Sequence, residues 1–243
     1  MISAEAKQKL QLALLLAMVV AGVRAGYILY QRHEDRVAAE KQKEAANVGY
    51  SNPDYYVNPK KLYPYDLKSA KQLTQQTVWV KEGYRYTYYP YEAASKQVDF
   101  AHEAGLLLPI EKLEIKDVVT AKSPGAGQRL QVMAVFQKEG KTYAVPIGFE
   151  ADQQYKIYSD EMFFVEDPRD LYKHWPADVW KAIEEHRVQN GMNELQASFA
   201  IGTGIPEGSG GDYGARTLHY ANDGKAMTVT FENDRAVAIK TEA

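Results

Sequence analysis

The first thirty residues carry the most continuous apolar stretch of the chain. Residues 10–23 contain no charged residue, and the apolar pattern continues to Tyr30 with Arg24 as its single charge. A helix needs about 20 apolar residues to cross the hydrocarbon core of a bilayer, and an off-centre Arg can extend toward the interface. The pattern therefore predicts a transmembrane anchor over residues 10–30, with Tyr27 and Tyr30 at the far interface.

Two other interpretations of this segment stay open. Lys7 and Lys9, the apolar run and the small residues beyond it also fit a secretory signal that is cleaved. A helix that is apolar on every face also suits the core of a soluble protein. Lys7 and Lys9 precede the run, whereas Arg32, Arg36, Lys41 and Lys43 follow it, so the positive-inside count favours a cytoplasmic carboxy side. Long domains, however, translocate largely regardless of charge. Because the start resembles an export signal, we expect a bacterial inner-membrane, single-pass protein with the bulk of the chain in the periplasm.

Residues 31–76 form a polar connector. Residues 31–47 carry mixed charges that suit an exposed helix, whereas residues 48–76 combine prolines with tyrosines. The prolines are Pro53, Pro59 and Pro64, and the tyrosines are Tyr50, Tyr55, Tyr56, Tyr63 and Tyr65. Prolines favour turns and extended chain, so this part is predicted to run extended and to pack along the following domain. The alternative is a docking strip for a partner protein, since Tyr is enriched at interfaces.

Residues 77–166 show the two-residue alternation that is typical of β-strands. The apolar positions of residues 130–137 and 143–149 alternate on either side of a polar turn at 138–141, which predicts an antiparallel hairpin. Several short strands within this length suggest a small closed barrel. The spacing weakly resembles that of bacterial SH3-like barrels, a family that usually supports binding rather than catalysis.

Residues 167–243 change to a helical and then to a strand pattern. After Pro176, which suits a first helical turn, Val179, Ala182, Ile183 and His186 recur at helical spacing. A second helix is predicted after Asn193, which can form a capping box with Gln196, and it is predicted to end at Gly202. A Gly-rich loop over 203–214 leads to three strands at 215–221, 225–232 and 236–240, joined by tight turns. One face of these strands is apolar and needs covering by the two helices.

The C-terminal region resembles a known family. Gly191, Met192 and Gln196, a helix that ends at Gly202, then Pro206 and a three-stranded meander are similar to the SmpA/OmlA family of BamE-like envelope domains, over about residues 177–241. The resemblance implies two helices on a three-stranded antiparallel sheet, a shape that also recurs in β-lactamase-inhibitor-like domains. Thr203 and Gly204 lengthen the turn that the family usually has. Its outer-membrane members are lipoproteins, and this chain has no Cys to acylate.

These segments together predict an α+β fold with four parts. The parts are a transmembrane anchor or signal over 1–30, the connector over 31–76, a small SH3-like β-barrel over 77–166, and a BamE-like ααβββ domain over 167–243.

Composition excludes several function classes. The chain has 29 Lys+Arg and 32 Asp+Glu, for a formal net charge of −3, which argues against an extended nucleic-acid surface. It has no Cys, so disulfides, thiolate zinc sites and Cys nucleophiles are excluded. An apolar content of 45% is typical of a globular chain rather than a disordered one. With 18 Tyr against 7 Phe and 3 Trp, tyrosine dominates the aromatic residues.

The sequence offers no convincing catalytic, cofactor or metal site. The five histidines are His33, His102, His174, His186 and His219, and no two have metal-ligand spacing on one element. Asp160 and Glu161 are adjacent, so on a strand they would face opposite sides. The Gly-rich stretch 202–211 follows a helix and precedes a strand, whereas a phosphate-binding loop follows a strand and opens a helix.

The function expected from the sequence is therefore non-catalytic. We expect a membrane-anchored envelope protein that acts in protein–protein interaction or scaffolding, with the membrane contacted through residues 10–30 and a protein partner, and without nucleic acid or nucleotide. The first alternative is an accessory subunit of an integral membrane complex. The second is an envelope hydrolase or a ligand-binding enzyme, which would need a deep polar pocket.

Overall fold

The computed structural model describes residues 22, 24, 26–27, 30–34, 36–37, 53–124, 129–208, 211–222 and 225–241. The chain divides into two units, Met1–Tyr55 and Tyr56–Ala243. In the first unit, the described residues between 22 and 37 are helical. Within this helix, the Tyr30 hydroxyl donates to Glu34 Oε1 at 3.0 Å.

The predicted transmembrane helix is contradicted. Within the described residues, no helix has both the length and the hydrophobicity that crossing a bilayer requires. The single-pass anchor, the membrane contact and the inner-membrane location predicted from residues 10–30 are withdrawn on this finding. Residues 10–21, which carry most of that apolar pattern, lie outside the described part of the chain, as do residues 38–47 of the predicted charged helix.

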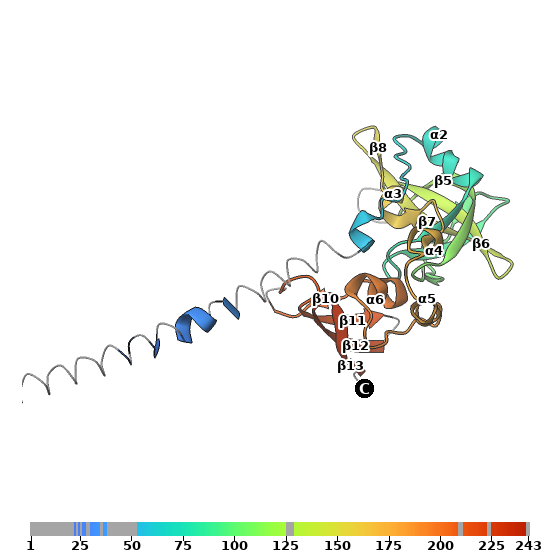
Figure 1. Cartoon of the computed structure of the whole chain (residues 1–243). Coiled ribbons are helices and arrows are strands. Elements are labelled where there is room, and N and C mark those ends of the chain that lie inside the picture. Colours follow the sequence, from blue (N-terminus) through green and yellow to red (C-terminus); the bar gives the residue numbers. More distant parts are fainter. Residues whose placement is uncertain are drawn as a thin grey trace, which may run out of the picture. The chain divides into compact units, whose positions relative to one another are not determined.

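The second unit begins with a short connector and a large antiparallel sheet (Figure 1). After the 3-10 helix η1 (Pro53–Tyr56), the chain runs extended to α2 (Leu67–Ala70) and η2 (Lys71–Gln75). The strands of the sheet are β1 (Thr77–Val80), β2 (Thr87–Glu92), β3 (Gln97–Val98), β4 (Gly105–Leu106), β5 (Lys112–Lys122), β6 (Leu130–Lys138), β7 (Lys141–Ala151), β8 (Gln154–Ile157) and β9 (Phe163–Phe164). Their order is β3-β2-β7-β6-β5-β1-β9, with β4 on β2 and β8 on β7.

The predicted hairpin at the centre of this sheet is confirmed. β6 and β7 pair from Lys138 opposite Lys141 to Gln131 opposite Phe149. The register shifts between Val132 and Met133, and Pro146 of β7 lies opposite Met133. A proline cannot donate a main-chain hydrogen bond to a ladder, so it is tolerated at such an irregularity.

The large sheet has an apolar core, and short helices follow it in the chain. One face of the large sheet buries a cluster that includes Phe136, Ile147 and Phe163. The chain then forms α3 (Ser159–Met162), α4 (Pro168–Leu171), α5 (Ala177–Glu184) and α6 (Glu194–Ile201). The predicted capping box of α6 is confirmed, because the Asn193 side chain accepts from Gln196 N and the Gln196 side chain accepts from Asn193 N. Gly202 ends the helix with φ 80°, a conformation that favours glycine.

The C-terminal sheet has four strands instead of three. β11 (Thr217–Asn222), β12 (Lys225–Glu232) and β13 (Arg235–Thr241) form the predicted meander, and β10 (Ile205–Pro206) extends it along β11. The turn between β12 and β13 is Asn233–Asp234, both at positive φ, as a tight two-residue hairpin turn requires. α5 and α6 cover one face of this sheet.

The predicted α+β fold class is wrong in its proportion of helix to strand. Within the described residues the chain is mostly β, with thirteen strands in two antiparallel sheets and only short helices. The large sheet has its own apolar core, and three residues of the first part, Trp79, Ile110 and Phe164, pack instead with α5, α6 and β11–β13 in the C-terminal core. Phe164 and Phe199 contact edge to face with ring centroids 5.7 Å apart. Strands that are only two residues long, such as β9 and β10, are too short to give a periodic signal in the sequence.

Candidate interaction surface

The connector after Tyr56 is held against the domain by alternate residues. Val57 packs against the C-terminal core, while Leu62 and Leu67 pack against the core of the large sheet. Pro64, between them, is buried. In extended chain, successive side chains point to opposite sides, so this anchoring directs the residues between them outward. The prediction that the connector packs along the following domain is confirmed for these residues.

Hydrogen bonds fix the same segment at both ends. The carboxylate of Glu166 accepts the main-chain N–H of Lys60 at 2.8 Å and lies 3.2 Å from the Lys60 ammonium. Both contacts favour the charged carboxylate, and the pKa of Glu166 is lowered, chiefly by the main-chain bond. At the other end, Asp66 Oδ1 accepts from Ser69 N at 2.7 Å, which completes a capping box at α2.

Three tyrosines project from this anchored segment. Tyr56, Tyr63 and Tyr65 are 75%, 70% and 77% exposed. We call these three residues the tyrosine strip. An isolated exposed apolar residue is normal on a protein surface. Tyr63 and Tyr65, however, are two residues apart in extended chain, so their side chains point to the same side. Tyr50, which belonged to the predicted strip, lies outside the described residues.

Charges of both signs lie along the strip, and Asp66 interacts electrostatically with Lys68. Lys60, Lys61 and Lys68 flank its tyrosines, and all three lysines are exposed. Lys60 pairs with Glu166. Lys61 and Lys68 form no ion pair within the part of the chain that the structure describes. Burial chiefly lowers the pKa of Lys81, and the nearby charge of Lys61 acts in the same direction, whereas the carboxylates of Asp160, Glu82 and Glu161 act in the opposite direction.

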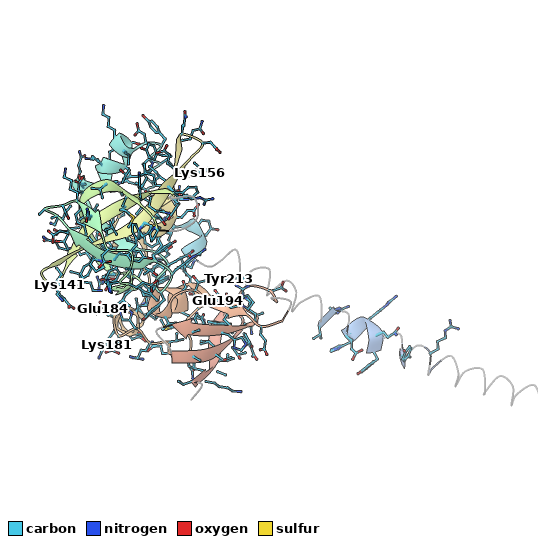
Figure 2. The ribbon with its side chains drawn as sticks, turned by 180° about the vertical axis from the view of Figure 1, so that it is seen from behind. Lys141, Lys156, Lys181, Glu184, Glu194 and Tyr213 are labelled. Carbon is cyan, nitrogen blue, oxygen red and sulfur yellow. The ribbon has the colours of Figure 1, made fainter. Side chains whose placement is uncertain are left out.

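A second cluster lies under the Gly-rich loop. Glu194, only 4% exposed, accepts from Gly214 N at 2.6 Å and from Arg216 Nη2 at 2.7 Å. The ring of Tyr213 lies over the Arg216 guanidinium at 5.5 Å, and the labels of Glu194 and Tyr213 in Figure 2 mark this place. Burial raises the pKa of Tyr220, which lies in the same region. Because both oxygens of the Glu194 carboxylate are engaged, the cluster ties the loop to α6 and offers no available acid or base.

The sequence contained little that would reveal this cluster. A Glu in the first turn of a helix, such as Glu194, is common at exposed positions. The sequence pattern gives no indication that Glu194 contacts Arg216, 22 positions later. The loop residues 209–210 lie outside the described part.

The histidines do not converge. His102 Nδ1 lies 2.8 Å from the exposed Asp99, and His186 Nδ1 lies 3.1 Å from the carbonyl of Ala200. His219 contacts Thr228 at 3.0 Å. His174 lies beside Tyr172 and Trp175, and His33 belongs to the first unit. Among the described residues, no group of three His, Asp or Glu side chains could hold a metal ion.

Asp160 and Glu161 lie on a short helix. They form the first turn of α3, and the ammonium of Lys81 donates to the main-chain carbonyl of Asp160. Their placement supports a local structural contact.

A comparison of this chain with protein-family models, curated proteins and solved structures finds no match. The resemblances to BamE-like domains and to SH3-like barrels stay predictions.

Proposed function

We propose that this chain is a non-catalytic interaction protein that docks an acidic partner protein through the tyrosine strip. The observation that carries the proposal is the alternation of the connector, in which Leu62, Pro64 and Leu67 pack against the domain while Tyr63 and Tyr65 between them stay exposed. Tyr56, at the end of η1, is exposed as well.

The fixed connector favours binding. A disordered segment loses conformational entropy when a partner orders it. Here Val57, Leu62 and Pro64 are already packed, and Glu166 already holds Lys60. Tyrosine adds a large contact area with few rotatable bonds, which is why it is common at binding hot spots.

The surrounding charge selects the class of partner. Lys61 and Lys68 are exposed and carry no ion pair among the described residues. A partner carboxylate would gain a charge-assisted contact with either ammonium. We therefore infer a protein partner that presents Asp or Glu next to an apolar patch.

Photo-cross-linking in the cells that make the protein tests this proposal. A photoreactive phenylalanine analogue replaces Tyr63 or Tyr65 in the full chain, and replaces Tyr213 as the matched control, since Tyr213 is also exposed at 52%. We expect positions 63 and 65 to give the same cross-linked adduct, and we expect this adduct to be weak or absent from position 213. The cross-linked partner peptide is expected to be acidic.

A charge reversal completes the test. Lys61→Glu with Lys68→Glu is expected to reduce the adduct about tenfold or more, because two attractive contacts become repulsive. Equal adducts from 63 and 213, or an adduct that is unaffected by the reversal, would contradict the proposal.

A further inference from the structure

Two residues of the large-sheet part have a main-chain conformation that their surroundings in the chain do not require. Among the described residues, positive φ outside glycine occurs mainly in the hairpin turns of the two sheets and just after α5. A tight hairpin turn or a helix end requires it there. Tyr84 and Ile110 are the exceptions, with φ of 60° and 57°, and neither lies in a hairpin turn or at a helix end.

Ile110 occupies the glycine position of a β-turn. Glu111 N donates to the carbonyl of Leu108 at 3.2 Å, which closes a four-residue turn with Pro109 second and Ile110 third. When the third residue of such a turn has positive φ, it is usually Gly or Asn. A β-branched residue is rare at positive φ, because its side chain crowds the main chain. We call residues 108–111 the strained turn.

The strained turn joins the large sheet to the C-terminal part. Main-chain bonds hold it to the end of β1, because Ile110 N donates to Val80 O at 2.9 Å and Val80 N donates to Glu111 O at 3.0 Å. The side chain of Ile110 packs against the C-terminal core. The turn is therefore fixed to the large sheet by its backbone and to the C-terminal part by a side chain, whose contacts offset the strain.

The loop before β2 braces the strained turn. Tyr84 N donates to Leu107 O at 2.7 Å. Gly83 lies so close to the turn that a Cβ at this position would be 2.1 Å from Pro109 Cδ. The ring of Tyr84 contacts His186, just after α5, edge to face with centroids 6.5 Å apart. Both strained residues thus contact the C-terminal part from neighbouring loops.

We propose that the strained turn is a latch, from which the C-terminal part separates reversibly while both parts stay folded. A strained backbone persists only while surrounding contacts hold it. When the C-terminal part moves away, Ile110 loses its contacts and the turn relaxes, so the strain favours the open state. Separation also uncovers Val57, Trp79 and Phe164, which pack against the same core. The open state is a second conformation with a new apolar surface.

Hydrogen exchange of the full-length protein under native conditions tests the latch. The Val80 amide reports separation, because its bond to Glu111 breaks when the turn relaxes. The Ala134 amide, in β6 between β5 and β7, reports global unfolding. We expect the protection factor of Val80 to be lower than that of Ala134 by about tenfold or more.

Substitutions at position 110 separate the strain from the packing. Ile110→Ala removes the contact with the C-terminal core and is expected to lower the protection of Val80 about tenfold. Ile110→Gly removes the same contact and also the strain. Val80 should therefore be about fivefold better protected in Ile110→Gly than in Ile110→Ala.

Ile239 provides the matched control. It is half-buried against the same core, but it lies in β13 and has no positive φ. Its contacts persist in the open state, so Ile239→Ala should lower the protection of Ala134 and leave that of Val80 unchanged. Ala134 should be less protected in Ile239→Gly than in Ile239→Ala, the reverse of the order at position 110.

Three results would overturn this inference. One is equal protection of Val80 and Ala134 in the unmodified protein, because the two parts would then unfold together. Another is a Val80 amide that is no better protected in Ile110→Gly than in Ile110→Ala. The third is a loss of Val80 protection in Ile239→Ala. None of them bears on the tyrosine strip, which is tested by cross-linking at positions 63 and 65.

Discussion

The carboxylate of Glu166 receives both the main-chain N–H and the ammonium of Lys60, at 2.8 and 3.2 Å. This relationship ties the connector to the end of the large sheet, 106 residues later in the chain. It is one of the contacts that keep the tyrosine strip in place.

Glu166→Gln is expected to loosen the connector without unfolding the domain. Gln keeps an acceptor for Lys60 N but loses the charge-assisted part of both contacts. Hydrogen exchange of the Lys60 and Lys61 amides should accelerate several-fold, while β6 and β7 stay protected. Glu114→Gln, which removes an exposed pair with Lys116, is the control and should leave these amides unchanged. Equal exchange in both variants would show that Glu166 does not hold the connector.

Neighbouring residues of the connector should differ sharply in their effect on stability. Leu62→Ala removes part of a side chain that packs on the sheet core and is expected to cost about 1–2 kcal/mol. Tyr63→Ala removes an exposed side chain and is expected to stay within about 0.5 kcal/mol. Urea unfolding of the two variants measures the difference, and similar values would mean that the alternation is absent in solution.

Arg216→Ala is expected to destabilise the C-terminal part by about 3 kcal/mol. The substitution leaves the buried Glu194 carboxylate with Gly214 N–H but without its cation. Arg85→Ala breaks an exposed pair with Glu82 and should cost less than about 1 kcal/mol. Chemical denaturation of both variants provides the comparison. A cost for Arg216→Ala as small as that of the control would show that the pair is solvated.

Stability should fall in alkaline solution, in part through Tyr86. Burial raises the pKa of Tyr86 to about 12, above the usual value of 10.0. Between these values the folded state binds more protons than the unfolded state, so this contribution is complete below pH 10 and is lost as the pH rises toward 12. Urea unfolding at pH 9, 10 and 11 should show the decline, and Tyr86→Phe should make it shallower. An unchanged slope in the variant would contradict the role of Tyr86.

Local patterns explain what the sequence could predict. The β6–β7 hairpin and the α6 capping box depend on residues close in the chain, and both are confirmed. Val57 and Phe164 join the C-terminal core from distant positions, and their neighbours give no sign of this. The Glu194–Arg216 pair is hidden for the same reason, because burial of a charge is a tertiary property.

The predicted membrane anchor shows a different limit. The anchor was predicted from the apolar residues over 10–30. That prediction is contradicted, because no described helix is long and apolar enough to span a bilayer. The tyrosines and prolines of the connector were identified from the sequence. Their alternation between buried and exposed positions required the packing of Leu62 and Pro64 to be known.

The most direct test of the account is the ratio of photo-cross-linked product formed from position 63 to that formed from position 213. Both side chains are exposed tyrosines, and they lie on different surfaces, with Tyr213 beside Arg216. If the tyrosine strip is the docking surface, the ratio should be about ten or more and should fall toward one in Lys61→Glu/Lys68→Glu. A ratio near one in the unmodified background would contradict the account.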